Sequence, residues 1–118
     1  QTCALPISQF YPPVLSVNGH IQDILKTPAG ELTDWTRACA VYAAGNINDI
    51  SFVNALTELL SDADTMIRET AVWALGKILP CEEAARLITG NINDSSVYVA
   101  RMARFVADGT GQTSFLGV

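Results

Sequence analysis

Apolar residues recur at helical spacing in several segments of the chain. The clearest set, spaced i, i+4, i+7, i+8 and i+11, is Ile67, Ala71, Ala74, Leu75 and Ile78. This spacing predicts an α-helix with one apolar side. Asp64 precedes the segment and suits the N-cap position, and Pro80 ends it. The alternation of apolar and polar positions that predicts a strand does not compete anywhere after residue 20.

The same pattern occurs more than once. Residues 35–47 repeat as residues 66–78 with a constant offset of 31, and six of the thirteen aligned positions are identical. A third and weaker copy follows at an offset of 32, where Phe105 takes the position of Trp73 but Ala100 replaces Arg68. A repeat of this length is typical of a solenoid, in which each unit buries its apolar sides against its neighbours.

Each copy is predicted to form two helices. The expected helices lie at 19–26 and 34–46, at about 52–60 and 65–79, and at 81–89 and 95–107. Together they predict an all-α domain over residues 19–107, with repeats at about 19–48, 49–80 and 81–107. We expect residues 8–18 to be an irregular lead-in, and residues 108–118 have the composition of a flexible tail.

The first seven residues are a separate matter. Residues 1–7 match the in-frame translation of a common short-read sequencing adapter. We therefore interpret them as an artefactual segment and exclude them from the predicted fold. The natural protein is then expected to extend further upstream, so that the chain is a fragment of a larger protein from environmental sequence.

Composition and charge narrow the class of protein. Apolar residues make up 49% of the chain and charged residues 16%, which predicts a packed core. Twelve acidic residues against seven Lys and Arg give a net charge of −5, which disfavours nucleic-acid binding and attachment to a membrane through a basic surface. The longest apolar run, 38–44, is too short to insert into a bilayer.

The cysteines and the absence of a recognisable leader bear on the compartment. Cys39 and Cys81 form no zinc or redox motif, and no stretch resembles a secretory signal. We expect a reducing, cytoplasmic environment. Because Cys39 lies within an Ala-rich helical stretch, we predict that it is a small buried or half-buried apolar residue.

Several residues of the repeat carry a family resemblance. They are Asp62, Arg68, Ala71, Ala74, Leu75, Gly76 and Ile78, matched in the first copy by Glu31, Arg37, Ala40, Ala43, Ala44, Gly45 and Ile47. This signature resembles the short bacterial HEAT-like repeat that also occurs in phycobilisome-lyase-like chains. The resemblance implies a HEAT-like, armadillo-like α-solenoid of about three antiparallel helix pairs. It also implies a ladder of carboxylate and guanidinium groups between consecutive repeats, involving Asp62 and Arg68, with an anion-binding row of Arg37 and Arg68 as the alternative.

A narrower resemblance concerns residues 34–40 and 67–71. These two segments are similar to bacterial HEAT segments that lie beside cyclic-nucleotide-binding domains, sometimes following a nucleotide-transporter-like membrane domain in the chain. None of the nucleotide-binding residues of such domains lies in this chain.

Three aromatic residues, Tyr42, Trp73 and Phe105, occupy one repeat position. On a helical wheel Trp73 lies about 145° from the apolar stripe of its own helix, so it does not belong to the inner core of its repeat. Either the three aromatic residues pack between repeats, or they form a partly exposed row that binds a protein or peptide. The second hypothesis gives a candidate partner-binding face of Arg37, Tyr42, Arg68, Glu69, Trp73 and Phe105.

No set of residues predicts chemistry. His20 is the only histidine and has no cysteine near it, and the carboxylate pairs stand at helix starts, where the helix dipole accounts for them. We therefore expect no enzyme activity, catalytic residue, cofactor or metal ligand. The predicted function is a protein-interaction or interdomain scaffold whose partner is a protein, a peptide or a neighbouring domain of the same chain. The alternatives are a regulatory HEAT segment of a cyclic-nucleotide-binding or nucleotide-transporter-like protein, and a bilin-lyase-like HEAT protein.

Overall fold

The computed structural model describes residues 14–109, so the segment 1–7, residues 8–13 and residues 110–118 lie outside the described part. Its α-helices are α1 Val14–Lys26, α2 Asp34–Ile47, α3 Val53–Leu59, α4 Thr65–Ile78, α5 Cys81–Leu87 and α6 Val97–Ala107. Two short 3₁₀ helices lie between them: η3 at Ile50–Phe52 leads into α3, and η4 at Thr89–Asn91 follows α5.

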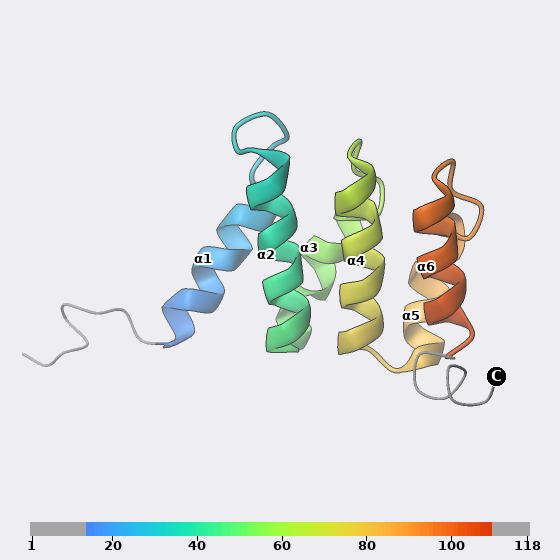
Figure 1. Ribbon diagram of the computed structural model, residues 1–118. Helices are drawn as coiled ribbons and strands as arrows, with labels where there is room; N and C mark the ends of the chain where they lie inside the picture. Colours follow the sequence, from blue (N-terminus) through green and yellow to red (C-terminus); the bar gives the residue numbers. More distant parts are fainter. Residues whose placement is uncertain (1–13, 110–118) are drawn as a thin grey trace, which may run out of the picture.

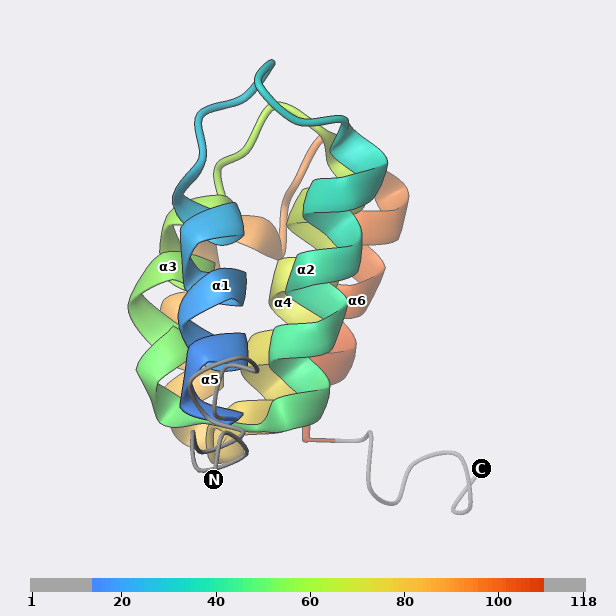
Figure 2. The same cartoon turned by 90° about the vertical axis from the view of Figure 1, so that its left-hand side faces the viewer.

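The helices form two layers. Figure 1 shows α2, α4 and α6 standing side by side in one layer, with α1, α3 and α5 in a second layer behind them. Seen along the stack in Figure 2, the two helices of each pair face one another across the space between the layers. Contacts between α2 and α4 and between α4 and α6 join successive pairs. The prediction of an all-α stack of about three antiparallel helix pairs is confirmed.

Side-chain caps set where the helices of the front layer begin. The side-chain oxygens of Thr33 and Asp64 accept hydrogen bonds from the backbone N–H groups of Thr36 and Ile67, each at 3.1 Å. Ser96 caps α6 in the same way through the N–H of Tyr98. These caps pair backbone donors that the first turn of a helix leaves without intrahelical partners.

Helix α1 differs from the sequence prediction. It begins at Val14 and not at residue 19, so the expectation of an irregular lead-in is wrong for residues 14–18. Polar contacts with the next repeat hold this helix. The amide of Asn18 donates to the carboxylate of Asp49 at 3.2 Å, and that of Gln22 donates to the carbonyl of Ser51 at 2.8 Å. Apolar periodicity does not reveal contacts of this kind.

The core runs through the whole stack between the two layers. Its largest fully buried side chains come from both layers and are Phe52, Leu56, Ile67, Leu75, Ile88, Val41, Val72 and Val99. Alanine residues fill the narrower contacts between helices, and Ala44, Ala71 and Ala74 are also fully buried. The middle pair, α3 and α4, therefore buries one side of its helices against the first pair and another against the third.

The glycine that ends each repeat signature makes room for the next repeat. A Cβ atom at Gly45 would lie 2.6 Å from Cζ3 of Trp73 and 3.1 Å from Cα of Ala74. A Cβ at Gly76 would lie 2.8 Å from Cγ2 of Val106. Distances below 3.0 Å are too short for a carbon contact, so glycine permits the close approach of α2 to α4 and of α4 to α6.

Candidate functional site

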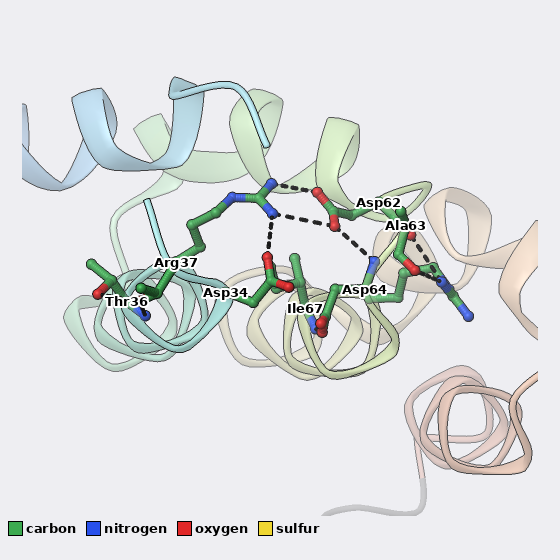
Figure 3. A network of polar contacts seen from close by, with 9 residues as sticks. Asp34, Thr36, Arg37, Asp62, Ala63, Asp64 and Ile67 are labelled. Atoms are coloured by element: carbon green, nitrogen blue, oxygen red, sulfur yellow. Dashed lines mark hydrogen bonds and ion pairs between the residues drawn. The ribbon is translucent and has the colours of Figure 1, made fainter. Parts of the chain in front are cut away.

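The loops between the paired helices hold a ladder of charged groups. Arg37 is buried, and its guanidinium forms two hydrogen bonds with the carboxylate of Asp62 in the next repeat. The same group lies 3.3 Å from the carboxylate of Asp34 on its own helix. Figure 3 shows the three side chains converging at the loop end of α2 and α4.

The next rung repeats this arrangement one helix pair further along. Arg68 donates from Nε and Nη2 to the two carboxylate oxygens of Asp94, at 3.0 and 2.9 Å. Its Nη1 donates to the backbone carbonyl of Asp62 at 2.9 Å. Each arginine thus pairs with the aspartate of the following repeat, and Arg68 reaches Asp62 only through the backbone. The ladder is confirmed, and the anion-binding row is wrong because both guanidinium groups already have carboxylate partners.

The ladder changes the titration of its carboxyl groups. Burial acts to raise the pKa of Asp62, but hydrogen bonds from Arg37 and from the backbone N–H of Asp64 outweigh it and hold that pKa below its usual value. The hydrogen bonds from Arg68 lower the pKa of Asp94, and the backbone N–H of Ser96 adds to the effect. The ladder therefore favours the charged form of both aspartates.

Acid should weaken this ladder. A carboxyl group whose pKa is lower in the folded than in the unfolded chain stabilises the fold above its unfolded pKa of about 4, and that contribution is lost as the pH falls through the folded pKa. Asp62→Asn and Asp94→Asn should each reduce stability near neutral pH and flatten its decline in acid. Urea unfolding between about pH 3 and 7 measures both effects.

The matched control for the acid experiment is Asp23→Asn, which changes an exposed carboxylate on α1 outside the ladder. This variant should follow the wild-type pH profile closely. If the free energy of unfolding falls as steeply in acid in the two ladder variants as in the wild type, the role of the ladder is contradicted.

The outer surface of the front layer carries an aromatic row. Tyr42 and Trp73 stack with ring centroids 5.0 Å apart and planes 11° from parallel. The ammonium of Lys77 lies 5.7 Å from the centroid of the Trp73 ring, within reach of a cation–π interaction. Tyr42 remains exposed, whereas Trp73 and Phe105 are half-buried. Tyr42 and Trp73 therefore pack against each other between successive repeats and also reach the surface, so features of both interpretations of this position are present.

A hollow opens beside this row, at the C-terminal ends of α2, α4 and α6. It has a volume of about 450 Å³, and its lining includes Trp73 and Lys77 of α4, Phe105 and Val106 of α6, and Cys81 of α5. Aromatic rings form part of its wall, and asparagine side chains from the end of α2 add polar groups. The hollow is large enough for one or two apolar side chains of a partner and lies next to exposed apolar surface.

A second row of large apolar side chains, not predicted from the sequence, lies seven residues before the first on each helix. Trp35, Met66 and Tyr98 occupy one repeat position, and they are 69%, 37% and 61% exposed. The offsets of the repeat relate these three residues just as they relate Tyr42, Trp73 and Phe105. The repeat alignment contained this signal, but only the structure shows that the side chains are exposed.

These features belong to one repeat architecture, in which stacked helix pairs share a ladder and a glycine contact. A family model for HEAT repeats matches residues 29–107. The chain belongs to the HEAT-repeat family. A search of curated proteins gave no significant match. The match spans the second helix of the first pair and both following pairs, so it includes both rungs of the ladder.

The structure of this HEAT-repeat protein separates the residues predicted for the partner-binding face. Tyr42, Trp73 and Phe105 lie along the outer surface of the front layer, and Glu69 is half-buried on α4 between the two apolar rows. Arg37 is buried within the ladder, and 14% of the Arg68 side chain is exposed. Placing these two arginines on the face was therefore wrong, because their charges are already paired with Asp62 and Asp94.

Other predicted features of the HEAT-repeat domain are also located by the structure. Cys39 is exposed on α2, contrary to the prediction, because it lies on the outer side of the helix with Trp35 and Tyr42. His20 is exposed on α1. Within residues 14–109, no helix is both long and apolar enough to cross a membrane, and no group of three His, Cys, Asp or Glu residues is placed to hold a metal ion.

Proposed function

We propose that this HEAT-repeat protein is a non-catalytic scaffold that binds a protein or peptide on the outer surface of α2, α4 and α6. The observation that carries the proposal is the grouping of large apolar side chains on this one layer. We call this surface the apolar face, and it consists of Trp35, Tyr42, Met66, Trp73, Tyr98 and Phe105.

The composition and burial of the apolar face support binding. Single exposed apolar residues are ordinary on protein surfaces, but several large apolar side chains gathered on one surface mark interaction sites. A few residues supply most of the binding energy of an interface, tryptophan and tyrosine are enriched among them, and the face contains two of each. The stack of Tyr42 on Trp73 holds two of these rings in fixed positions, which lowers the entropy lost on binding.

Selection from a displayed library of random peptides of about 16 residues tests this function. The recovered peptides should bind the wild-type chain and lose at least about tenfold in affinity for the double variant Trp35→Ser and Tyr98→Ser. Both side chains are more than half exposed, so the double variant should keep its fold, which circular dichroism and thermal unfolding will check.

The matched control replaces two exposed apolar residues outside the apolar face, Ile50→Ser and Leu87→Ser. These residues lie on η3 and α5, and their replacement should leave peptide affinity unchanged. Failure to recover any peptide would contradict the proposed function. Peptides that bind both double variants equally well would place the binding surface elsewhere and would also contradict it.

A further inference from the structure

The two rows of the apolar face border a strip that crosses the front layer. On each helix the row residues are seven positions apart, for example Trp35 and Tyr42 on α2. Seven residues make almost two turns, so the rows lie on nearly the same side of each helix and about 10.5 Å apart along its axis. Between the rows the strip contains Cys39, Glu69, Thr70, Arg101 and Met102.

We propose that the partner presents an amphipathic α-helix that lies along this strip, across α2, α4 and α6. This inference rests on the proposed function and specifies its ligand. The width of the strip, about 10.5 Å, is close to the diameter of an α-helix with its side chains, about 10–12 Å. Large side chains of the two rows then border the bound helix on both sides, and shorter ones such as Cys39 and Thr70 lie beneath it.

The spacing along the strip also fits a helix. Packed helices lie about 8–10 Å apart. The tight contacts at Gly45 and Gly76 show that α2, α4 and α6 are closely packed. A helical ligand repeats the same side every seven residues, or about 10.5 Å, so it can present one apolar contact to each of the three helices. Side chains on one side of an extended strand recur every ~6.6 Å, which does not match the distance between neighbouring helices of this layer.

A polyproline helix repeats about every 9.3 Å and would also match the spacing of the three helices. The width of the strip favours the α-helix, because only the thicker ligand contacts both rows at once. We therefore commit to the α-helical ligand, and a proline-rich ligand is one of the outcomes that the experiment distinguishes.

The charges in the strip define the orientation of the ligand. Glu69 lies in the strip on α4 and Arg101 lies in it on the neighbouring helix α6. Neither has an ion-pair partner within residues 14–109. A ligand helix that places a basic residue over Glu69 therefore places the residue seven positions away over Arg101, where an acidic side chain is favoured. One heptad of the ligand should carry this pair of opposite charges.

The hollow accepts the ligand's largest side chain. Trp73 and Phe105 border the strip and also line the hollow of about 450 Å³. A leucine, phenylalanine or tryptophan of the ligand helix can extend between these two rings, away from the strip. Such a buried apolar anchor is a common source of affinity in helix-in-groove recognition.

The peptides recovered from the library provide the test. We expect their consensus to show apolar residues at i, i+3 or i+4, and i+7, with a basic and an acidic residue seven positions apart. The free peptides should gain helical circular dichroism on binding to the full chain. A proline substituted at the centre of a peptide should weaken binding at least about tenfold, because proline breaks the helix.

Charge exchange tests the orientation. Arg101→Glu should weaken binding of the charged peptides at least about tenfold, and replacement of their acidic residue by lysine should restore it. The control is Arg86→Glu, which reverses an exposed charge on α5 in the other layer and should have no effect. In a variant in which Cys39 is the only cysteine, the bound peptide should also slow maleimide labelling of this exposed thiol.

The outcomes separate this inference from the proposed function. Peptides that bind the apolar face in extended or proline-rich form, tolerate a central proline and gain no helicity would overturn the helical ligand and leave the scaffold function intact. Loss of affinity on Arg101→Glu without rescue by the exchanged peptide would overturn the charge orientation. Recovered peptides that ignore the Trp35 and Tyr98 replacements would overturn the proposed function itself.

Discussion

Ala71→Arg should unfold this protein or destabilise it by about 3–5 kcal/mol. Ala71 is fully buried on α4, at the centre of the stack. An arginine there would introduce a long side chain into packed surroundings and a charge without a partner, and each of these is costly. The melting temperature should fall by at least about 10 °C, or the cooperative transition should disappear, as thermal unfolding followed by circular dichroism will measure.

The matched control introduces the same residue on the outer side of the same helix. Met66 is 37% exposed, and Met66→Arg should change stability by less than about 1 kcal/mol. Comparable losses in the two variants would contradict the assignment of the inner and outer sides of α4. Helix propensity contributes little to the difference, because alanine, methionine and arginine all favour helices.

Gly45→Ala should destabilise the protein by about 1–3 kcal/mol, although alanine favours helices. The added Cβ would lie 2.6 Å from the Trp73 ring and 3.0 Å from the Cβ of Ala74. Relief of this overlap requires α2 and α4 to separate or the stack of Tyr42 and Trp73 to shift. Urea unfolding measures the loss of stability, and tryptophan fluorescence should report the shift at Trp73.

Gly19→Ala is the control, since it makes the same chemical change inside another helix. A Cβ at Gly19 on α1 would meet no atom within 4 Å. The change should therefore stabilise the protein by up to about 1 kcal/mol through helix propensity alone. The change in stability on replacement by alanine should therefore have opposite signs at Gly45 and Gly19. Stabilisation at both sites would mean that glycine is not needed for the contact between repeats.

Local features of the sequence predicted most of the fold. The second helices were expected to start after Thr33 and Asp64, and both residues cap helices in the structure. The end of α2 was expected at residue 46 and lies at Ile47, because Asn48 adopts a left-handed conformation and its N–H bonds to Ala44. Caps and apolar periodicity act within a few residues of the chain, so the sequence alone contains the information that determines them.

The site was only partly predictable from the sequence, as its two apolar rows and its arginines show. Tyr42, Trp73 and Phe105 were identified because the repeat places them at one position. The same repeat relates Trp35, Met66 and Tyr98, but these residues differ in type, and nothing local indicates that their side chains are exposed. Arg37 was expected on the candidate face beside the aromatic row, whereas the structure buries it against Asp62.

That the chain is a stack of helix pairs follows from its amino-acid sequence, because periodicity, caps and the repeat are written in the order of its residues. Which aspartate each arginine pairs with depends on the packing of one repeat on the next, as Arg68 reaches Asp94 in the next repeat. This packing also determines that α1 extends to Val14 and that Cys39 faces outward. The ion pairs and the contacts of α1 join groups about 25 to 31 residues apart, which only the packing of one repeat on the next brings together. The exposure of Cys39 depends on which side of α2 the neighbouring helices cover.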